Sequence, residues 1–130
     1  VVLADSAFSL SSYAKTMSGD ESHLMYPSKE LNEEIIASAK KLGYPIHVGR
    51  IHSSDNFYYD EGHNGQGEEN GCLAVEMESF ALFHNADILH KKAACLLTIS
   101  DSFVSHKVTT PEERQKSFTK MMEIALECAE

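Results

Sequence analysis

The chain of 130 residues carries a formal net charge of −9, with 42% hydrophobic and 24% charged residues. This composition predicts a globular protein that is one domain or part of one. The acidic excess argues against binding of nucleic acid, and no apolar run approaches the roughly 18 residues of a membrane helix. We therefore expect neither a nucleic-acid partner nor a membrane partner.

The three cysteines, Cys72, Cys95 and Cys128, have apolar neighbours and no C-x-x-C spacing. We expect them to be reduced, buried and structural, as in a cytoplasmic protein. The chain opens on the apolar residues 1–4, which have the composition of the middle of a strand and include no initiator methionine. We expect the amino-terminal part of the protein to precede them.

The first half of the chain predicts two strands joined by a helix. Residues 1–5 form a short buried strand, and the polar stretch 6–27, too long for a simple connection, is expected to be a functional loop. Ser28 and Gly43 suit the two ends of a helix. The apolar face of that helix consists of Leu31, Ile35, Ala39 and Leu42. Residues 45–51 form the next strand, and this order predicts a parallel pair with a right-handed crossover.

The second half predicts two further strands and two helices. Residues 53–59 form a polar turn and 60–71, rich in glycine and acids, a mobile loop. The apolar run 72–75 is a buried strand end, and the helix after it reaches about residue 90 with an apolar face of Met77, Phe80, Ala81, His84 and Ile88. Residues 93–99 lack charge and predict a central parallel strand buried on both faces. The last helix begins with a capping box at Thr110 and Glu113, and its core face is Phe118, Met121, Met122, Ala125 and Ala129.

Two acids, Glu76 and Glu78, lie where a strand passes into a helix, and ligands of α/β proteins gather at such strand ends. Glu78 could accept two hydrogen bonds from a vicinal diol, because an ionised carboxylate has two acceptor oxygens. It could equally be a solvent-facing helix glutamate. Phe57 and Tyr58 could stack on a flat ring or pack under the adjacent loop.

Asp101 follows directly on the predicted strand 93–99. A carboxyl group there is expected to be partly desolvated, which favours the protonated form that a general acid needs. The alternative is a loop aspartate that caps the next turn. Arg114 lies in the first turn of the last helix, where the helix dipole disfavours a cation, so it either pairs with an acid such as Asp101 or is a solvated arginine.

The histidines lack H-E-x-x-H spacing, so we expect no metal site. The glycines of residues 62–71 lack the lysine and the strand-to-helix context of a phosphate-binding loop.

Three successive motifs, AVEMES (74–79), LTISD (97–101) and TTPEERQKSF (109–118), resemble those of purine nucleoside phosphorylases of the bacterial-type, hexameric branch of the nucleoside phosphorylase superfamily. The stretch VGRIHSSDNFY (48–58) resembles that family's fourth motif. The resemblance covers most of the chain from about Gly43 onward. It implies a three-layer α/β/α fold with a central mixed, mainly parallel sheet, of which residues 1–130 are the C-terminal part of a single domain.

The resemblance also implies roles for individual residues. Asp101 would protonate or hydrogen-bond N7 of the purine as the glycosidic bond breaks, and Arg114 would assist that proton transfer. Glu78 would bind the ribose 2′- and 3′-hydroxyls. The other residues that it implies around the base and sugar are Phe57, which would stack on the purine, Tyr58, Val75, Glu76, Met77 and Ser100.

The implied reaction is phosphorolysis of purine (deoxy)ribonucleosides to free base and (deoxy)ribose 1-phosphate, with inorganic phosphate as co-substrate and no other cofactor. The family's phosphate-binding residues lie in its amino-terminal part, so this chain is expected to carry only the base and ribose half of the site. The resemblance further implies a hexamer built from dimers. Two alternatives remain open, a hydrolytic nucleosidase of methylthioadenosine and adenosylhomocysteine, and a non-catalytic fragment that binds nucleoside.

Overall fold

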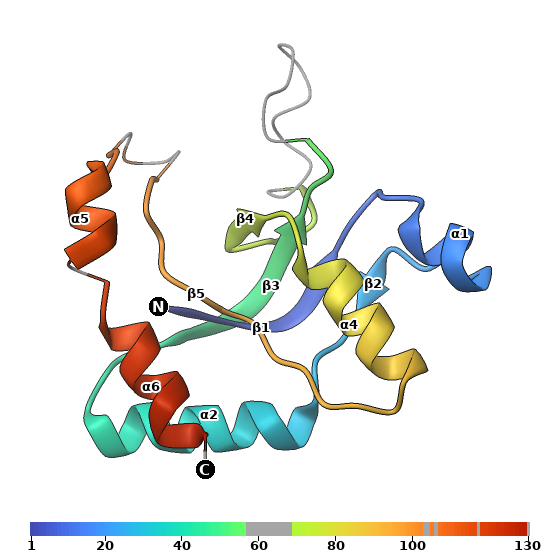
Figure 1. Ribbon diagram of the computed structural model, residues 1–130. Coiled ribbons are helices and arrows are strands. Elements are labelled where there is room, and N and C mark those ends of the chain that lie inside the picture. The colour runs from blue at the N-terminus through green and yellow to red at the C-terminus, as the bar shows by residue number, and fades with distance from the viewer. Residues whose placement is uncertain (57–68, 103–104, 106, 117, 130) are drawn as a thin grey trace.

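The structure is a computed structural model that describes residues 1–56, 69–102, 105, 107–116 and 118–129. Figure 1 shows a small sheet with helices around it. The strands are β1 (Val2–Phe8), β2 (Leu24–Met25), β3 (His47–Ser53), β4 (Ala74–Glu76) and β5 (Leu96–Leu97). The helices are α1 (Tyr13–Ser18), α2 (Lys29–Leu42), α4 (Ser79–Ile88), α5 (Pro111–Lys116) and α6 (Lys120–Cys128).

Strand β1 is the centre of the sheet, whose order is β2-β1-β3-β4. It runs parallel to β3, and β3 runs parallel to β4. The short strands β2 and β5 pair antiparallel with opposite ends of β1, β2 with its last residues and β5 with its first. Parallel pairing therefore dominates a mixed sheet, and the predicted parallel pair of the first half is confirmed.

Helices cover both faces of the sheet because side chains of β1 alternate between two apolar clusters. Ala4 belongs to a cluster with Phe80 of α4, whereas Leu3 belongs to a cluster with Ile35 of α2 and Ile124 of α6. All five of these side chains are nearly or fully buried. The three-layer α/β/α arrangement predicted from the sequence is confirmed.

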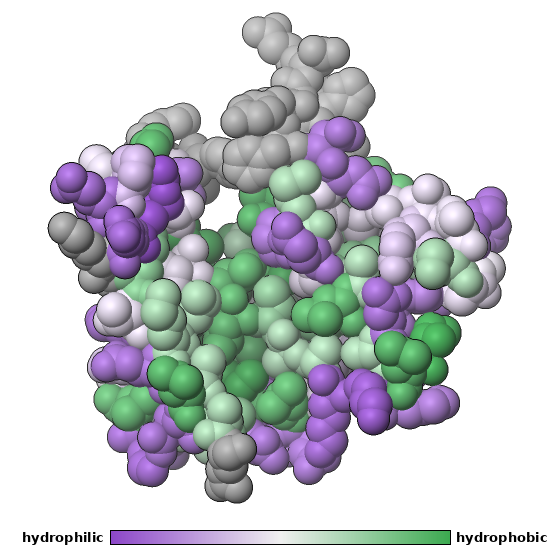
Figure 2. Space-filling view, viewed as in Figure 1, coloured by the Kyte–Doolittle hydropathy of each residue, from purple (hydrophilic) through white to green (hydrophobic). Residues whose placement is uncertain are grey.

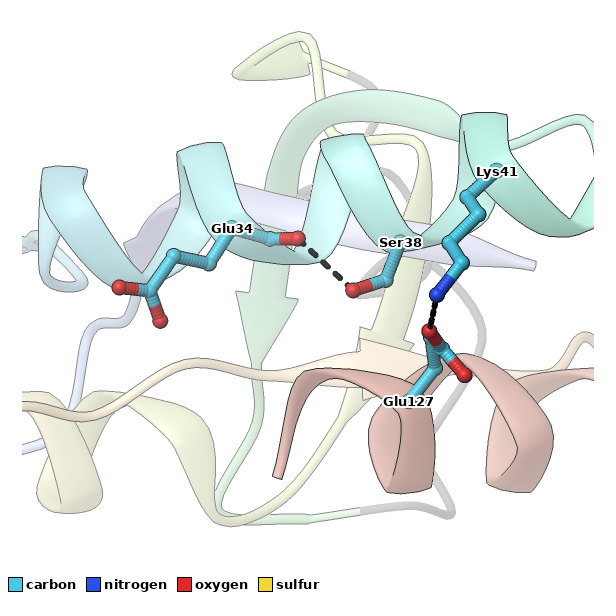
Figure 3. A network of polar contacts seen from close by, with 4 residues as sticks. All are labelled: Glu34, Ser38, Lys41 and Glu127. Carbon is cyan, nitrogen blue, oxygen red and sulfur yellow. Dashed lines mark hydrogen bonds and ion pairs between the residues drawn. The ribbon is translucent and has the colours of Figure 1, made fainter. Parts of the chain in front are cut away.

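Helix α2 forms between the two ends that the sequence predicted. The Ser28 hydroxyl accepts a hydrogen bond from the Leu31 backbone N–H at 3.2 Å, and Gly43 ends the helix in the left-handed region with φ of 73°. Figure 3 shows the contact of α2 with α6, where Lys41 forms an ion pair with Glu127. The same view shows the Ser38 hydroxyl donating to the Glu34 carbonyl at 3.0 Å within α2.

The predicted functional loop at residues 6–27 is wrong. Strand β1 continues through Phe8, and the helix α1 and the strand β2 follow it. The many serines of this stretch made it resemble a solvated loop in the sequence. In the structure several of them are buried or form hydrogen bonds within the chain. Ser9, for example, is 2% exposed, and its hydroxyl accepts from the backbone N–H of Ser11 at 3.1 Å.

The prediction of a central parallel strand at residues 93–99 is also wrong. Only Leu96 and Leu97 form a strand, β5, which is antiparallel to β1 and half-buried. Among the described residues β5 pairs with β1 alone, so one of its edges carries no strand. The composition of this segment thus suits a more enclosed position than the one it occupies.

The apolar residues on either side of β4 are more exposed than predicted. Leu73, expected in a buried strand end, is 54% exposed, although strand β4 itself forms. Phe80 and His84 face the core from α4 as expected, whereas Ile88 on the same predicted face is exposed. Phe83, which the predicted face omitted, is buried in its place.

The carboxyl-terminal helix is interrupted between Lys116 and Lys120, so it is two helices, α5 and α6. At its start the Thr110 hydroxyl accepts from the Glu113 backbone N–H at 3.1 Å, which confirms the predicted cap. The predicted core face of this helix is wrong. Ile124 is fully buried there, whereas Met122 is 50% exposed.

Candidate active site

The first group of candidate residues lies at the strand–helix junction, residues 74–79, where β4 ends and α4 begins. The Glu76 carboxylate accepts hydrogen bonds from the backbone N–H groups of Glu78 at 2.6 Å and Ser79 at 2.8 Å, and from the Ser79 hydroxyl. It thus satisfies donors that a helix start otherwise leaves unpaired, and its negative charge suits the positive end of the helix dipole. The turn that carries the neighbouring residues is fixed by this carboxylate.

Glu78 occupies the N-cap position of α4 but is exposed. One of its carboxylate oxygens accepts from the Met77 backbone N–H at 3.2 Å, and the other has no hydrogen-bond partner among the described residues. Met77 is 44% exposed, and Val75 is half-buried. The junction therefore presents one carboxylate to solvent while its neighbour, Glu76, is engaged in capping.

The end of β3 supports the junction from the side. Ser53 lies opposite Glu76 in the parallel register, and the Ser53 hydroxyl accepts from the Phe80 backbone N–H at 3.3 Å. His52, opposite Val75, is buried with its ring 5.6 Å from that of Phe8. Burial lowers the pKa of His52, and the charge of Glu76 opposes that shift.

The second group is the acid segment, residues 101–114, which begins after β5 and includes the start of α5. Asp101 forms an antiparallel bridge with Val108, and its carboxylate accepts from the Thr109 backbone N–H at 3.0 Å. Arg114 donates to the Thr109 carbonyl at 2.7 Å and to the Thr109 hydroxyl at 3.3 Å. Asp101 and Arg114 are therefore joined through Thr109 and do not pair directly.

The expected desolvation of Asp101 is wrong for this structure. Its side chain is exposed, and so is that of Arg114, while Ser100 is half-exposed. Burial was predicted from a long central strand before Asp101, but β5 ends at Leu97. The described residues around the acid segment do not remove it from water.

Cys95 lies near the first group of residues, the strand–helix junction. Burial, followed by the charges of Glu76 and Glu78, raises the pKa of the Cys95 thiol to about 12. Both carboxylates therefore lie within electrostatic range of Cys95, which precedes Asp101 by six residues. Within the described residues no hydrogen bond or ion pair joins Glu78 to Asp101.

Two predicted residues, Phe57 and Tyr58, lie outside the described residues. Three unpredicted residues contribute to the geometry: Ser79 at the junction, His52 beside it and Thr109 in the acid segment. The signal for Thr109 was present, because it directly precedes the helix cap and lies five residues before Arg114. His52 had none, because its ring contact with Phe8 joins residues that are distant in sequence.

A shallow hollow of about 550 Å³ lies elsewhere, lined by Asp5, Ser6, Tyr26, Arg50, Asn70 and Gly71. The Arg50 guanidinium crosses it, donating to the Ser6 hydroxyl at 3.3 Å and the Asn70 carbonyl at 3.0 Å. None of the predicted site residues lines it. No cluster of three metal-ligating side chains occurs in the part of the chain that the structure describes. Nor does any helix there have the length and apolarity to cross a bilayer.

The cysteines form no disulfide, and each is half-buried where burial was predicted. Burial also raises the pKa of the Cys72 thiol, against the opposing charge of Arg50. Cys72 and Cys95 are therefore protonated near neutral pH, which fits the structural role expected of them.

Comparison with known proteins identifies the family. The model of the phosphorylase superfamily matches residues 1–130. The DeoD-type purine nucleoside phosphorylase of Mycoplasma genitalium is 40% identical over 130 residues, covering 98% of this chain and 55% of that protein. Its counterpart from Jannaschia sp. is 38% identical, covering 99% and 56%. The chain belongs to the phosphorylase superfamily.

A solved structure supports the fold independently of sequence. The purine nucleoside phosphorylase of Toxoplasma gondii, crystallised in complex with immucillin-H, matches with a TM-score of 0.81 at 14% identity. The match covers 98% of this chain and 53% of the Toxoplasma chain. The chain therefore spans about half the length of the Toxoplasma gondii protein and also about half the length of the bacterial relatives.

Proposed function

We propose that the protein to which this chain belongs cleaves purine (deoxy)ribonucleosides by phosphorolysis, giving free base and (deoxy)ribose 1-phosphate. The observation that carries the proposal is the similarity of nearly the whole chain to DeoD-type purine nucleoside phosphorylases at about 40% identity. The candidate acid and the candidate sugar ligand both lie in motifs that resemble those of that family.

The reaction develops opposite charges on the sugar and on the base. The strand–helix junction suits the positively charged sugar, and the acid segment suits the negatively charged base. Breaking the N-glycosidic bond leaves positive charge on the ribose and negative charge on the departing purine. Glu78 has an exposed carboxylate that can accept hydrogen bonds from both ribose hydroxyls and stabilise the positive sugar. Asp101 donates a proton to N7 of the purine, and phosphate attacks C1′ from the opposite side.

Arg114 acts in this proposal through Thr109. Because Thr109 bonds to both Asp101 and Arg114, it holds the guanidinium near the carboxyl group without forming an ion pair. An ion pair would stabilise the carboxylate and so weaken Asp101 as a proton donor. When a purine reaches Asp101, Arg114 can stabilise the carboxylate that the proton transfer leaves behind.

The remaining expectations belong to the same proposal. Val75, Glu76, Met77 and Ser100 surround the base and sugar, Phe57 stacks on the purine, and Tyr58 lies beside it. Inorganic phosphate is bound by residues outside this chain. The assembled protein is cytoplasmic and a hexamer built from dimers, as the resemblance implies.

The test measures purine release by the full-length enzyme from inosine and adenosine, with and without phosphate. Asp101→Asn is expected to lower kcat by roughly 10² to 10⁴-fold, because an amide cannot donate the proton in the same way. The matched control is Asp87→Asn, an exposed aspartate on α4, for which kcat stays within about twofold. Full activity in Asp101→Asn would refute the assigned acid, and release that does not need phosphate would refute phosphorolysis.

A further inference from the structure

Four polar side chains form a hydrogen-bonded cluster between α1 and α4 (Figure 1), outside the candidate active site. They are Tyr13 and Ser18 of α1 and His84 and Asn85 of α4. We call them the Ser–His–Asn cluster. Ser18 and His84 are 66 positions apart in the sequence, so only the folded chain brings them together.

The distances within the cluster are those of a nucleophile, a base and an orienting group. The Ser18 hydroxyl oxygen lies 2.8 Å from Nε2 of His84, and Oδ1 of Asn85 lies 3.2 Å from Nδ1 of the same ring. A serine beside an imidazole that a third group orients is the arrangement that enzymes use for covalent catalysis.

Asn85 decides which ring nitrogen of His84 carries the proton. Its side-chain oxygen accepts a hydrogen bond from the Tyr13 hydroxyl at 3.0 Å, so this oxygen faces the ring as well and Nδ1 donates to it. In the neutral ring Nε2 then has a lone pair, and that lone pair faces Ser18. The ring is therefore in the tautomer that can take a proton from a serine hydroxyl.

The Ser18 hydroxyl has a second acceptor within reach. Its oxygen lies 3.1 Å from the Ala14 carbonyl, one turn earlier on α1, against 2.8 Å from His84. A hydroxyl has one proton to donate, and an imidazole nitrogen is more basic than a peptide carbonyl. The shorter contact is therefore also the one that favours transfer of the proton.

The cluster is buried at its base and open at its nucleophile. His84 is 4% exposed, whereas Ser18 is exposed. Gly19 follows with φ of 76°, and a Cβ atom placed on it would meet no described atom within 4 Å. The surface at α1 is of mixed, mostly intermediate hydropathy, in contrast to the hydrophobic surface between α4 and α6 (Figure 2). A small molecule can thus reach the hydroxyl from water.

Lys15 supplies a positive charge near the nucleophile. It lies three positions before Ser18 on α1, where helix side chains are neighbours. Its ammonium group forms an ion pair with Glu21 at 3.1 Å, and both side chains are exposed. Exposed ion pairs of this kind are weak, so the ammonium group is available to stabilise an oxyanion that develops beside Ser18.

We propose that Ser18 is a nucleophile with His84 as its base, and that the Ser–His–Asn cluster hydrolyses small activated esters. Ser18 Oγ forms a bond to the carbonyl carbon and passes its proton to Nε2 of His84. The ester C–O bond then breaks, and His84 gives the proton to the departing alcohol. Water next attacks the acyl group, loses a proton to His84 and releases the acid, and His84 returns the proton to Ser18. Asn85 positions the ring, and the activity does not depend on the proposed phosphorolysis.

The experiment treats the full-length protein with a fluorophosphonate probe, which bonds to activated serines, and locates the label by mass spectrometry of its peptides. We expect the label on Ser18. His84→Gln should lower the labelling rate at least about tenfold, because general-base catalysis is worth roughly 10² to 10⁴-fold. The matched control is Ser12→Ala, which removes an exposed hydroxyl at the other end of α1 and leaves the rate within about twofold. Hydrolysis of p-nitrophenyl acetate should change in the same order.

Asn85 is tested as a positioning residue by a conservative and a non-conservative change. Asn85→Asp keeps an acceptor oxygen beside Nδ1 and should keep the labelling, whereas Asn85→Leu should lower its rate at least about tenfold. A cluster that only holds α1 against α4 would leave Ser18 of the wild-type protein unlabelled, and that result overturns the proposal. Equal labelling of the wild type and His84→Gln overturns it as well. The wild-type result stands even where a variant does not fold.

Discussion

The two halves of the candidate site differ in how much of their structure is local. At the strand–helix junction, Glu76 accepts three hydrogen bonds and Phe80 anchors the turn in the core. The acid segment has a single bridge to Val108 and contacts through Thr109, and both Asp101 and Arg114 are exposed. The strand–helix junction is thus held in place by contacts within this chain, whereas the acid segment is exposed to solvent and held by few contacts.

The largest expected effect is on stability. It tests whether core packing holds the strand–helix junction more firmly than the acid segment. Phe80→Ala should lower the free energy of unfolding by about 3–5 kcal/mol, because Phe80 is 2% exposed and its removal leaves a cavity. Phe118→Ala, at a half-exposed residue between α5 and α6, should cost less than half as much. Urea unfolding followed by circular dichroism measures both. Equal losses would remove the distinction between the two regions.

The next effect concerns catalysis by the junction. Glu78→Gln in the full-length enzyme should lower kcat/KM for inosine by about 10- to 100-fold, because hydrogen bonds to a charged group contribute roughly 1.5–3 kcal/mol. Glu33→Gln, at an exposed glutamate of α2, is the matched control and should leave kcat/KM unchanged. Wild-type kcat/KM in Glu78→Gln would show that the sugar is held elsewhere.

A smaller effect separates the two carboxylates of the junction by stability. Glu76→Ala should cost about 1–2 kcal/mol in the free energy of unfolding, since it removes the acceptor that caps α4. Glu78→Ala, two residues away but exposed, should cost less than about 0.5 kcal/mol. Were Glu78 the more costly of the two, the division between a capping and a ligand-binding acid would be reversed.

The smallest effect is the pH dependence that His52 contributes. Because burial lowers its pKa below the ordinary value of 6.5, the unfolded chain binds the proton more readily than the folded chain does. The stability associated with His52 is therefore complete above about pH 6.5 and is lost as the pH falls through the lower folded pKa. His52→Phe should flatten the decline in unfolding free energy between about pH 7 and pH 5. His47→Phe, at the exposed start of the same strand, should leave that decline as it is.

Much of the fold was predictable because the sequence patterns that indicate it involve residues close together in the chain. The cap at Ser28, the end at Gly43 and the cap at Thr110 all depend on residues within four positions, and all three formed as expected. Motifs also identified the family before the structure did, since each is a continuous run of residues. The α1–β2 region escaped prediction because its serines bond within the chain, which composition does not reveal.

The helix ends of α2, the parallel pair of β1 and β3, the cap of α5 and the family could all be inferred before the fold was known. The burial of Ile124 in α6, the edge position of β5 and the exposure of Asp101 became visible in the folded chain. The physical reason is the separation along the chain of the residues that interact. A cap or a periodic face is fixed by neighbours along the chain, whereas the burial of a side chain is fixed by whatever packs against it in space.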